Sequence, residues 1–389
     1  MAKYEAPDFF DIDGLLTEEE RMVRDAVREW VSDRWMPVVE KAYREGFFPN
    51  DLIPELAELG VLGGNLDYGD FPRLGPVAYG LVMQELERGD SGLRSFVSVQ
   101  GALVMYPIWR YGTDEHRDTW LPKLHSGEAI GCFGLTEPDH GSDPGGMETM
   151  AVRDGDGFIL NGAKMWITNG SMADVAVVWA KLDCVVRGFV VPTDTPGFSA
   201  PEQRGKHSLR ASVTSELIMQ DVRLPESALL PGAEGLGGPL SCLNQARYGI
   251  AWGVVGAAMA VYDEVRQYGI ARTQFDRPLA SFQLYQAKLV ETLSEITKAQ
   301  LMNLQLGRLK EAGNVSPFHV SMAKRNACHD ALEIARRGRD MLGANGVADE
   351  YQTMRHMCNL ESVKTYEGTH DIHTLILGRH ITGLNAFGG

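Results

Sequence analysis

The sequence lacks an apolar run long enough to cross a membrane. Its longest uncharged stretch of interest, residues 248–262, is shorter than the roughly 20 residues that a bilayer-spanning helix requires. Glycine and alanine are frequent there, and Gly249, Gly253 and Gly256 all lie on it. These small residues predict a buried helix that packs closely against other helices, and we expect no membrane insertion.

Cysteine is scarce, and its spacing does not suggest a disulfide framework. The five cysteines (Cys132, Cys184, Cys242, Cys328 and Cys358) are odd in number and far apart, and they form no Cys-x-x-Cys motif. This pattern favours a reducing compartment. The first eight residues carry acids and no apolar run, so we expect no signal or transit peptide. The expected location is the bacterial cytoplasm or, for a mature eukaryotic chain, the mitochondrial matrix.

Positive charge is also deficient. The 37 Lys and Arg residues face 52 Asp and Glu residues, which gives a net charge of -15, so we expect no nucleic acid as a partner. The glycines at 232–238 do not follow Gly-x-Gly-x-x-Gly spacing, and no βαβ pattern surrounds them, which argues against nicotinamide binding. His370 and His373 lack a third ligand at convincing spacing, so we expect no metal site.

The patterns that are present follow an α-β-α order, which predicts an α+β fold. Near the N-terminal end, Thr17 and Glu20 form a capping-box pattern, apolar residues follow at helical spacing, and Pro37 is expected to close the helix. Further helices are expected near residues 51–59, 73–88, 94–111 and 114–126. A chain of 389 residues suits two or three domains, and we expect the first, an α-helical domain, to span residues 1–127.

Short β-prone runs separated by turn signals fill the middle of the chain. Turn dipeptides at 154–157 and 161–162 flank an apolar triplet, a pattern typical of hairpins. Residues 175–180 and 188–191 are expected to form strands. We therefore expect a small antiparallel β domain over residues 128–238.

The last third of the sequence is helical again. Long helical patterns cover residues 281–312 and 317–342. They predict a C-terminal four-helix bundle domain over residues 239–389.

One carboxylate stands out. Glu367 follows an apolar helix end and is flanked by Tyr366 and by Gly368-Thr369, after which a new helix is expected. Glycine lets a ligand approach the backbone closely, and threonine caps helix starts. A carboxylate shielded from water in this break would have a raised pKa and could act as a base. The alternative is an exposed glutamate in a helix–helix turn.

Two loops of the β region have features of a ligand site. Residues 132–143 combine hydroxyls with glycines, so they can offer hydroxyls and backbone N–H groups to a polar ring edge or a phosphate, although many turn-rich loops share this composition. At residues 166–170 a strand ends with an aromatic side chain beside a hydroxyl. Trp166 can wall a flat cofactor ring, or it can be a core tryptophan, which is the commoner role.

Four motifs resemble signatures of the flavin-dependent acyl-CoA dehydrogenases, namely LTEPDHGSD at 135–143, WITN at 166–169, RTQF at 272–275 and YEGT at 366–369. They occur in that family's order and spacing, and the resemblance covers essentially the whole chain. Residues 90–95, 243–253 and 365–383 are most similar to family members that act on glutaryl-CoA. The resemblance implies FAD as the cofactor and an acyl-CoA thioester as the substrate.

The resemblance also implies roles for single residues. Glu367 would remove the α-proton of the acyl thioester. Residues expected to contact the flavin are Phe133, Leu135, Thr136, Gly141, Ser142, Trp166, Ile167, Thr168 and Thr369. Residues expected to reach the FAD of a neighbouring subunit, with Ala344 where many relatives have a second glycine, are Arg272, Gln274, Phe275, Gln283, Asp340, Met341, Leu342, Gly343 and Ala344. Residues expected to bind the substrate are Glu87, Arg94, Ser95, Ser98, Ser142, Leu243, Asn244, Arg247, Tyr366 and Gly368.

Arg94 indicates the kind of acyl chain. A buried arginine is costly unless it is paired, and a dicarboxylic acyl chain supplies a carboxylate to its guanidinium. From the residues alone, the alternative is a surface arginine paired with Asp90 or Glu87. Given the resemblance, we expect Arg94 to bind the distal carboxylate, with Glu87 and Ser95 in the same polar network. Leu93 stands where relatives often carry tyrosine.

The implied reaction is FAD-dependent oxidation and decarboxylation of glutaryl-CoA to crotonyl-CoA and carbon dioxide. The resemblance further implies a homotetramer that passes electrons to electron-transfer flavoprotein, and Glu87 and Tyr366 favour the decarboxylating type. Alternatives are a non-decarboxylating or other short-chain or dicarboxylic acyl-CoA dehydrogenase, an oxidase, and an inactive flavoprotein that binds acyl-CoA.

Overall fold

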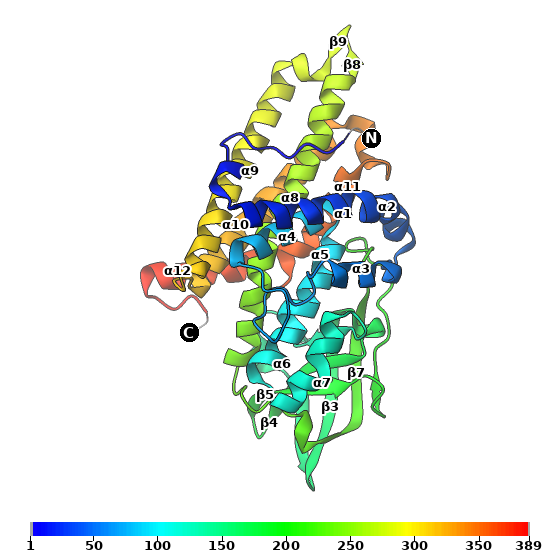
Figure 1. Cartoon of the computed structure of the whole chain (residues 1–389), viewed down its shortest axis with the longest axis vertical. Coiled ribbons are helices and arrows are strands. Elements are labelled where there is room, and N and C mark those ends of the chain that lie inside the picture. Colours follow the sequence, from blue (N-terminus) through cyan, green and yellow to red (C-terminus); the bar gives the residue numbers. More distant parts are fainter. Residues whose placement is uncertain (1–2, 388–389) are drawn as a thin grey trace.

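The computed structural model describes residues 3–387. Helices occupy both ends of the sequence and strands occupy its middle, which confirms the predicted α+β class. In Figure 1 the main sheet lies at one end of an elongated molecule. The small hairpin of β8 (Thr273–Gln274) and β9 (Arg277–Pro278) marks the opposite end, and long helices run between the two.

The N-terminal helices come first in the chain. They are α1 (Glu18–Trp30), α2 (Met36–Glu45), α3 (Ile53–Glu58), α4 (Pro76–Gly89), α5 (Ser91–Ser98), α6 (Tyr106–Tyr111) and α7 (Asp114–His125). The capping box at Thr17 and Glu20 is present at the start of α1, as predicted. The expected helical stretch 94–111 is continuous, because the π-helical turn η4 (Val99–Met105) joins α5 to α6.

The prediction that Pro37 closes the first helix is wrong. The chain stays helical from Glu18 to Glu45, because the π-helical turn η2 (Val31–Trp35) links α1 directly to α2. Pro37 lies in the first turn of α2. The continuous helix accommodates this proline because the π-helical turn just before it already departs from the i→i−4 hydrogen-bond pattern that a proline would break.

The main sheet has seven strands, and its topology creates a loop that matters for the site. The strands are β1 (Gly131–Gly134), β2 (Met150–Asp154), β3 (Gly157–Thr168), β4 (Val175–Leu182), β5 (Val185–Pro192), β6 (Phe198–Ser199) and β7 (Thr214–Pro225). The β2–β3, β3–β7, β4–β5 and β6–β7 pairs are antiparallel, but β1 and β2 both pair with β4 in parallel, so the sheet is mixed rather than purely antiparallel. β1 pairs with the first half of β4 and β2 with its last residues, so the connection 135–149 leaves the sheet between them.

Asn161 and Gly162 do not form a turn as predicted. Both lie inside β3, where the pairing with β7 shifts register between Leu160 and Gly162. The Asn161 side chain exchanges hydrogen bonds with Asp221, donating Nδ2 to Oδ1 (3.1 Å) and accepting from the backbone N–H (2.8 Å). A β-bulge and a turn both favour glycine, so the local sequence does not distinguish one from the other.

Five helices form the C-terminal part. They are α8 (Gly237–Ala271), α9 (Gln283–Glu311), α10 (Pro317–Met341), α11 (Gln352–Thr365) and α12 (His370–Thr382). The first four pack against one another as the predicted bundle, and α12 lies against α10 (Figure 1). A Cβ added at Gly256 would overlap the carbonyl of Gln84, so α4 and α8 approach each other closely, as the small residues of α8 predict.

None of the helices in residues 3–387 is long and apolar enough to span a membrane. The five cysteines are all free, as the sequence predicts, and Cys132, Cys242 and Cys328 are buried. Burial raises the pKa of the Cys132 thiol to about 12, which fits its expected role as a small apolar side chain.

Candidate active site

The turn at residues 366–368 separates α11 from α12, as predicted. Glu367 has a φ of 53° and Gly368 a φ of 94°, both in the left-handed region. The Thr369 hydroxyl caps α12 by accepting a hydrogen bond from Ile372 N (3.1 Å). A left-handed glutamate is unfavourable on its own and persists only where its surroundings hold it, so this turn is a candidate functional element.

The Glu367 side chain is half-buried. Its Oε2 atom is buried and has no hydrogen-bond partner among the described residues. Desolvation raises the pKa of this carboxyl above its ordinary value of 4.5, although Arg94, Arg247 and Lys324 act in the opposite direction. An unpaired carboxylate with a raised pKa suits a general base, and the alternative of an exposed glutamate is wrong.

Arg94 is buried next to this turn. It is 1% exposed, and its Nε donates a hydrogen bond to Oε2 of Glu87 at 2.7 Å. One of its terminal nitrogens bonds the hydroxyl of Tyr366, and that hydroxyl lies 3.3 Å from Ser95 Oγ. The polar network predicted around Arg94 is therefore present in part, and it includes the ring of the residue before Glu367.

Of the alternative, a surface arginine paired with Asp90 or Glu87, the pairing with Glu87 is present, but the surface position and the pairing with Asp90 are wrong. Asp90 caps α5 through Gly92 N (2.7 Å) and forms an ion pair with Arg355 (3.0 Å). Arg94 is left with Glu87 as its anionic partner, and this pair is buried.

Several polar atoms near Arg94 have no partner among the described residues. They are Oε1 of Glu87, the hydroxyl of Ser98 and the hydroxyl of Tyr79. Burying a polar group without a hydrogen bond costs about 1–3 kcal/mol, so three such atoms in one region indicate a place where a ligand or water supplies the missing bonds.

Arg247 lies against the 366–368 turn, and its expected place along the substrate channel stays a prediction. Its Nε donates to the backbone carbonyl of Glu367 (2.7 Å), and NH1 reaches Asn244 Oδ1 (3.3 Å). Arg247 therefore holds the turn itself, and Asn244 holds Arg247. Leu243, on the same stretch of α8, is half-buried. Gly368 has no room for a side chain, because an added Cβ would lie 2.8 Å from His373 Nε2 and 3.3 Å from Arg247 NH2.

The first set of predicted flavin contacts lies where the chain leaves the sheet between β1 and β2. Gly141 and Ser142 are exposed and Thr136 is half-buried, whereas the side chains of Phe133 and Leu135 are buried in the core. Met165 N donates to the carbonyl of Thr136 (2.9 Å), which joins this loop to the end of β3.

Trp166 lies on the surface beside that loop. It is 61% exposed and has a φ of 64°, so it is not the core tryptophan that was the alternative. Ile167 turns into the core and Thr168 is half-buried. An exposed indole next to the hydroxyls of Thr136 and Thr168 fits the edge and face of a flat polar ring system, which is the chemistry that an isoalloxazine requires.

The second set of predicted flavin contacts lies at the far end of the molecule. Phe275, at the tip of the β8–β9 hairpin, is 89% exposed, and Arg272, Gln274 and Gln283 are exposed near it. Figure 1 places this hairpin at the end opposite the main sheet. A single chain therefore does not bring the two sets together, in agreement with the expectation that the second set reaches a neighbouring subunit.

Within the segment 340–344 the predicted contacts divide. Asp340 forms an ion pair with Lys288, Met341 and Leu342 are buried in the core of the bundle, and Gly343 and Ala344 are exposed. The side chains of Met341 and Leu342 are thus structural.

Sequence reasoning missed two buried lysines. Lys324 donates to the carbonyls of Tyr366 and Gly368, both at 2.9 Å. Lys164 pairs with Glu137 (2.8 Å), whose other hydrogen bonds, from the N–H groups of residues 148 and 149, close the base of the loop 135–149. Each lysine lies among buried residues of its own helix or strand. A lysine at a core position of such a pattern is the sequence signal that would have identified it.

Models of the acyl-CoA dehydrogenase family match three successive parts of the chain. The N-terminal domain model matches residues 17–128, the middle domain model residues 132–222 and the C-terminal domain model residues 233–382. The chain belongs to the acyl-CoA dehydrogenase family, as its motifs predict. This family is FAD-dependent, so the cofactor prediction is confirmed at the level of the family.

Individual solved structures and curated relatives show which members of the family this chain is similar to. Glutaryl-CoA dehydrogenase from Mycobacterium smegmatis is 55% identical, with a TM-score of 0.97 over 99% of this chain and 100% of that chain. A second structure of a glutaryl-CoA dehydrogenase from that organism, in complex with FADH2, is 51% identical with the same TM-score and coverage. The mitochondrial short-chain specific acyl-CoA dehydrogenase of Bos taurus is 33% identical over 384 residues, covering 94% of this chain and 90% of the relative.

Proposed function

We propose that this acyl-CoA dehydrogenase oxidises and decarboxylates glutaryl-CoA to crotonyl-CoA and carbon dioxide. The observation that carries the proposal is the buried guanidinium of Arg94, which is within electrostatic reach of Glu367 and has a single carboxylate partner, Glu87. A second carboxylate, at the far end of a five-carbon acyl chain, fits the remaining donors of that guanidinium. The 55% identity to a mycobacterial glutaryl-CoA dehydrogenase supports the same substrate.

Glu367 is the proposed base. Its buried, unpaired Oε2 takes the proton from the carbon next to the thioester, and the desolvation that raises the pKa of this carboxyl makes it a better proton acceptor. Arg94 fixes the other end of the acyl chain, so the α-carbon is held at one distance from the carboxylate. Binding the acyl chain at both ends orients it for reaction, and such orientation supplies a large part of enzymatic rate enhancement.

FAD, when bound, accepts the hydride that leaves the β-carbon of the acyl chain. We propose that Thr136, Ser142, Trp166 and Thr168 hold its ring system, because these exposed or half-buried groups lie in the loop 135–149 and at the end of β3. Thr369 is a further proposed contact, next to the base.

Carbon dioxide loss follows from the product of the oxidation. The α,β double bond makes the bond between the γ-carbon and the distal carboxylate vinylogous to the thioester, so the electrons of that breaking bond pass through the double bond into the thioester as a dienolate. The proton held by Glu367 then returns to the γ-carbon, which gives crotonyl-CoA. Glu367 is a carboxylate again at the end, because it has given back to the γ-carbon the proton that it took from the α-carbon.

The proposal extends to partners. The exposed hairpin residues Arg272, Gln274 and Phe275 face away from the site of their own chain, so we propose that they contact the FAD of a neighbour in a homotetramer. Electrons then leave to electron-transfer flavoprotein.

The test is anaerobic mixing of the FAD-loaded protein with glutaryl-CoA. We expect the flavin absorbance to bleach, crotonyl-CoA to form, and one carbon dioxide to be released per flavin reduced, with Glu367→Gln as a matched control that binds substrate without bleaching. Glutaconyl-CoA without carbon dioxide would establish a non-decarboxylating dehydrogenase instead. Butyryl-CoA oxidised in preference to glutaryl-CoA would establish a short-chain enzyme, as in the Bos taurus relative.

A further inference from the structure

Lys324 is a buried cation that the proposed reaction does not use directly. It lies on α10 in a run of buried positions that includes Val320, Ala323, Ala327 and Cys328, and it is 1% exposed. Among residues 3–387, no carboxylate lies within ion-pair distance of its ammonium group, whose hydrogen bonds go to two backbone carbonyls. A buried lysine without a carboxylate partner is expensive, so its position calls for a reason.

The two carbonyls belong to the residues on either side of the base. Lys324 Nζ donates to Tyr366 O and to Gly368 O, each at 2.9 Å. Arg247 Nε donates to the carbonyl between them, that of Glu367, at 2.7 Å. Three successive carbonyls are thus held by two cations from two different helices, α10 and α8.

This arrangement accounts for the left-handed backbone of Glu367. A non-glycine residue in that region costs about 1–2 kcal/mol, and it is retained where several contacts over-determine the conformation. The three hydrogen bonds orient the carbonyls of residues 366–368 toward the cations. The direction of the Glu367 side chain is fixed as a consequence.

We propose that Lys324 is a positioning residue that, together with Arg247, clamps the 366–368 turn so that the Glu367 carboxylate points at the α-carbon of the acyl chain. The inference rests on the proposed role of Glu367 as the base. Lys324 touches neither the substrate nor the reacting atoms in this arrangement, because its ammonium hydrogens are directed to the backbone.

The charge of Lys324 also bears on the protonation of the base. The charged and titratable groups that interact with Glu367 are Arg94, Arg247, Lys324, Glu87, Tyr79, Tyr366, Cys328 and His373. Lys324 is one of three cations that lower the pKa of Glu367 against the effect of burial. Removing this cation therefore raises the pKa of Glu367 further, so the acidic limb of the activity profile moves to higher pH.

The experiment compares Lys324→Met with Lys206→Met. Lys206 is a control for the loss of a lysine that bonds the backbone: it is half-buried and donates to the carbonyls of Leu209 (3.0 Å) and Ser212 (2.8 Å) and to Thr214 Oγ1 (2.6 Å), away from the 366–368 turn. For Lys324→Met we expect kcat to fall about 100-fold, as for a misplaced catalytic group, with KM changed less than threefold. We also expect the acidic limb of kcat to move to higher pH, while FAD content and the thermal midpoint match those of Lys206→Met.

A second variant, Lys324→Gln, covers the case in which Lys324→Met does not fold. It keeps one donor and loses the charge, so we expect a smaller fall in kcat and the same upward move of the acidic limb. An unmoved limb in the folded variant, or a kcat loss equal to that of Lys206→Met, overturns the inference. If the unaltered protein does not oxidise glutaryl-CoA, the proposed substrate fails, and the same comparison is made with whichever acyl-CoA it oxidises.

Discussion

Two glutamates of α4, two residues apart, pair with arginine in opposite ways. Glu85 faces α1, where its two oxygens accept hydrogen bonds from Arg28 (2.8 Å) and Arg88 (2.9 Å). Glu87 faces α5, where one oxygen accepts from Arg94 (2.7 Å) and the other has no partner among the described residues. Both carboxylates are fully buried, so the difference lies in how completely their hydrogen bonds are satisfied.

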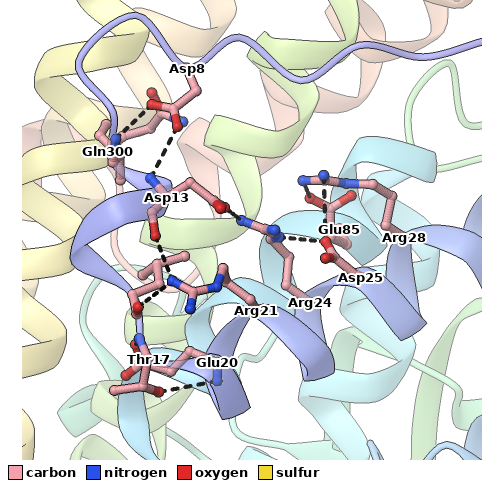
Figure 2. Close-up of polar contacts among 12 residues, drawn as sticks. Asp8, Asp13, Thr17, Glu20, Arg21, Arg24, Asp25, Arg28, Glu85 and Gln300 are labelled. Atoms are coloured by element: carbon pink, nitrogen blue, oxygen red, sulfur yellow. Dashed lines mark hydrogen bonds and ion pairs between the residues drawn. The ribbon is translucent and has the colours of Figure 1, made fainter.

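We call the cluster around Glu85 closed because both of its carboxylate oxygens are paired, although Arg28 Nε and the Tyr4 hydroxyl, which are also buried there, have no partner among the described residues. Figure 2 shows Arg28 of α1 reaching Glu85, in a region where other arginines and aspartates of the N-terminal segment also pair. Arg88 donates further to the carbonyl of Arg28 (2.9 Å) and to Ser32 (3.0 Å), and its guanidinium lies 4.5 Å from the centre of the Tyr4 ring. Such a network joins helices and leaves few donors for a ligand.

The cluster around Glu87 is open. Arg94 shares its donors between Glu87 and the hydroxyl of Tyr366, and unpaired oxygens remain at Glu87, Ser98 and Tyr79. The same residue types thus give a structural joint on one flank of α4 and a ligand-ready pocket on the other. Residue identity does not separate a stabilising ion pair from a binding one, whereas the pairing of both oxygens of the carboxylate does.

The largest effect is expected from Arg94→Ala, which tests whether the open cluster binds the substrate while the closed one does not. Removing one partner of a buried, hydrogen-bonded charge pair costs about 4 kcal/mol, so kcat/KM for glutaryl-CoA should fall about 1000-fold. Butyryl-CoA has no distal carboxylate, and its kcat/KM should fall less than about tenfold. Steady-state assays on both substrates measure the ratio. The control Arg28→Ala should lower stability without changing that ratio, and equal losses on both substrates in Arg94→Ala would remove the assigned role.

The next largest effect is expected in stability, for Glu85→Gln. The change leaves Arg28 and Arg88 buried without their counter-charge, so unfolding at pH 7 should become easier by about 3 kcal/mol. Although desolvation raises it, the two arginines lower the pKa of Glu85 below its ordinary value of 4.5. A lowered folded-state pKa stabilises the protein above that ordinary value and loses this contribution as the pH falls through the lowered value.

The pH dependence therefore sharpens the test. The difference in denaturant midpoint between the unaltered protein and Glu85→Gln should shrink as the pH falls below 4.5. The control Glu40→Gln removes an exposed pair with Arg44, which should change stability by less than about 0.5 kcal/mol. A difference for Glu85→Gln that is constant with pH would mean that the closed cluster is not stabilised by charge.

Local patterns predicted the parts of the site that local geometry determines. The break at Tyr366-Glu367-Gly368 and the cap at Thr369 were predictable, because a helix end, a glycine and a capping hydroxyl are adjacent in the sequence. The exposed Trp166 and the loop after β1 were predictable only as alternatives, because the same composition fits an ordinary turn. The resemblance to the family, rather than the periodicity of the sequence, favoured the ligand-binding interpretation of both.

What stayed hidden depends on contacts between distant residues. Lys324 lies 42 residues from Tyr366 in the sequence, and Lys164 lies 27 residues from Glu137, so no local pattern joins either lysine to its partner. Arg247 was predicted to line the substrate channel, but its hydrogen bond to the carbonyl of Glu367, 120 residues away, was not foreseen. Likewise, the π-helical turn that accommodates Pro37 responds to packing around α1 and α2, because propensity alone ends a helix at proline.

A smaller effect on the open cluster is expected from Tyr366→Phe. The hydroxyl bonds Arg94 and lies 3.3 Å from Ser95 Oγ, and a hydrogen bond to a charged group contributes about 1.5–2 kcal/mol. The ratio of glutaryl-CoA to butyryl-CoA activity should therefore fall about 10- to 30-fold. The control Tyr268→Phe removes a hydroxyl that accepts from Asn345 Nδ2 (3.1 Å), and it should leave the ratio unchanged. An unchanged ratio in Tyr366→Phe would mean that Arg94 is oriented by Glu87 alone.

The smallest expected effect comes from Gly253→Ala, which tests why α8 carries a glycine opposite Glu87. An added Cβ would overlap Oε2 of Glu87 and lie 3.3 Å from Cγ of Arg94. Alanine favours a helix over glycine by about 1 kcal/mol, which offsets part of the 1–3 kcal/mol that overpacking typically costs, so the change in stability should be small. Displacing the Glu87 carboxylate should instead tilt Arg94 and lower the glutaryl-CoA to butyryl-CoA ratio about fivefold.

Gly249→Ala is the matched control on the same helix. Its added Cβ would lie 3.2 Å from Cγ of Met83, a flexible side chain that can move aside, so the ratio should stay the same while the gain in helix propensity remains. Measuring both ratios and both thermal midpoints separates the two effects. If Gly253→Ala and Gly249→Ala behave alike, the glycine at 253 serves only the close approach of α4 and α8, and the open cluster tolerates crowding as the closed one would not.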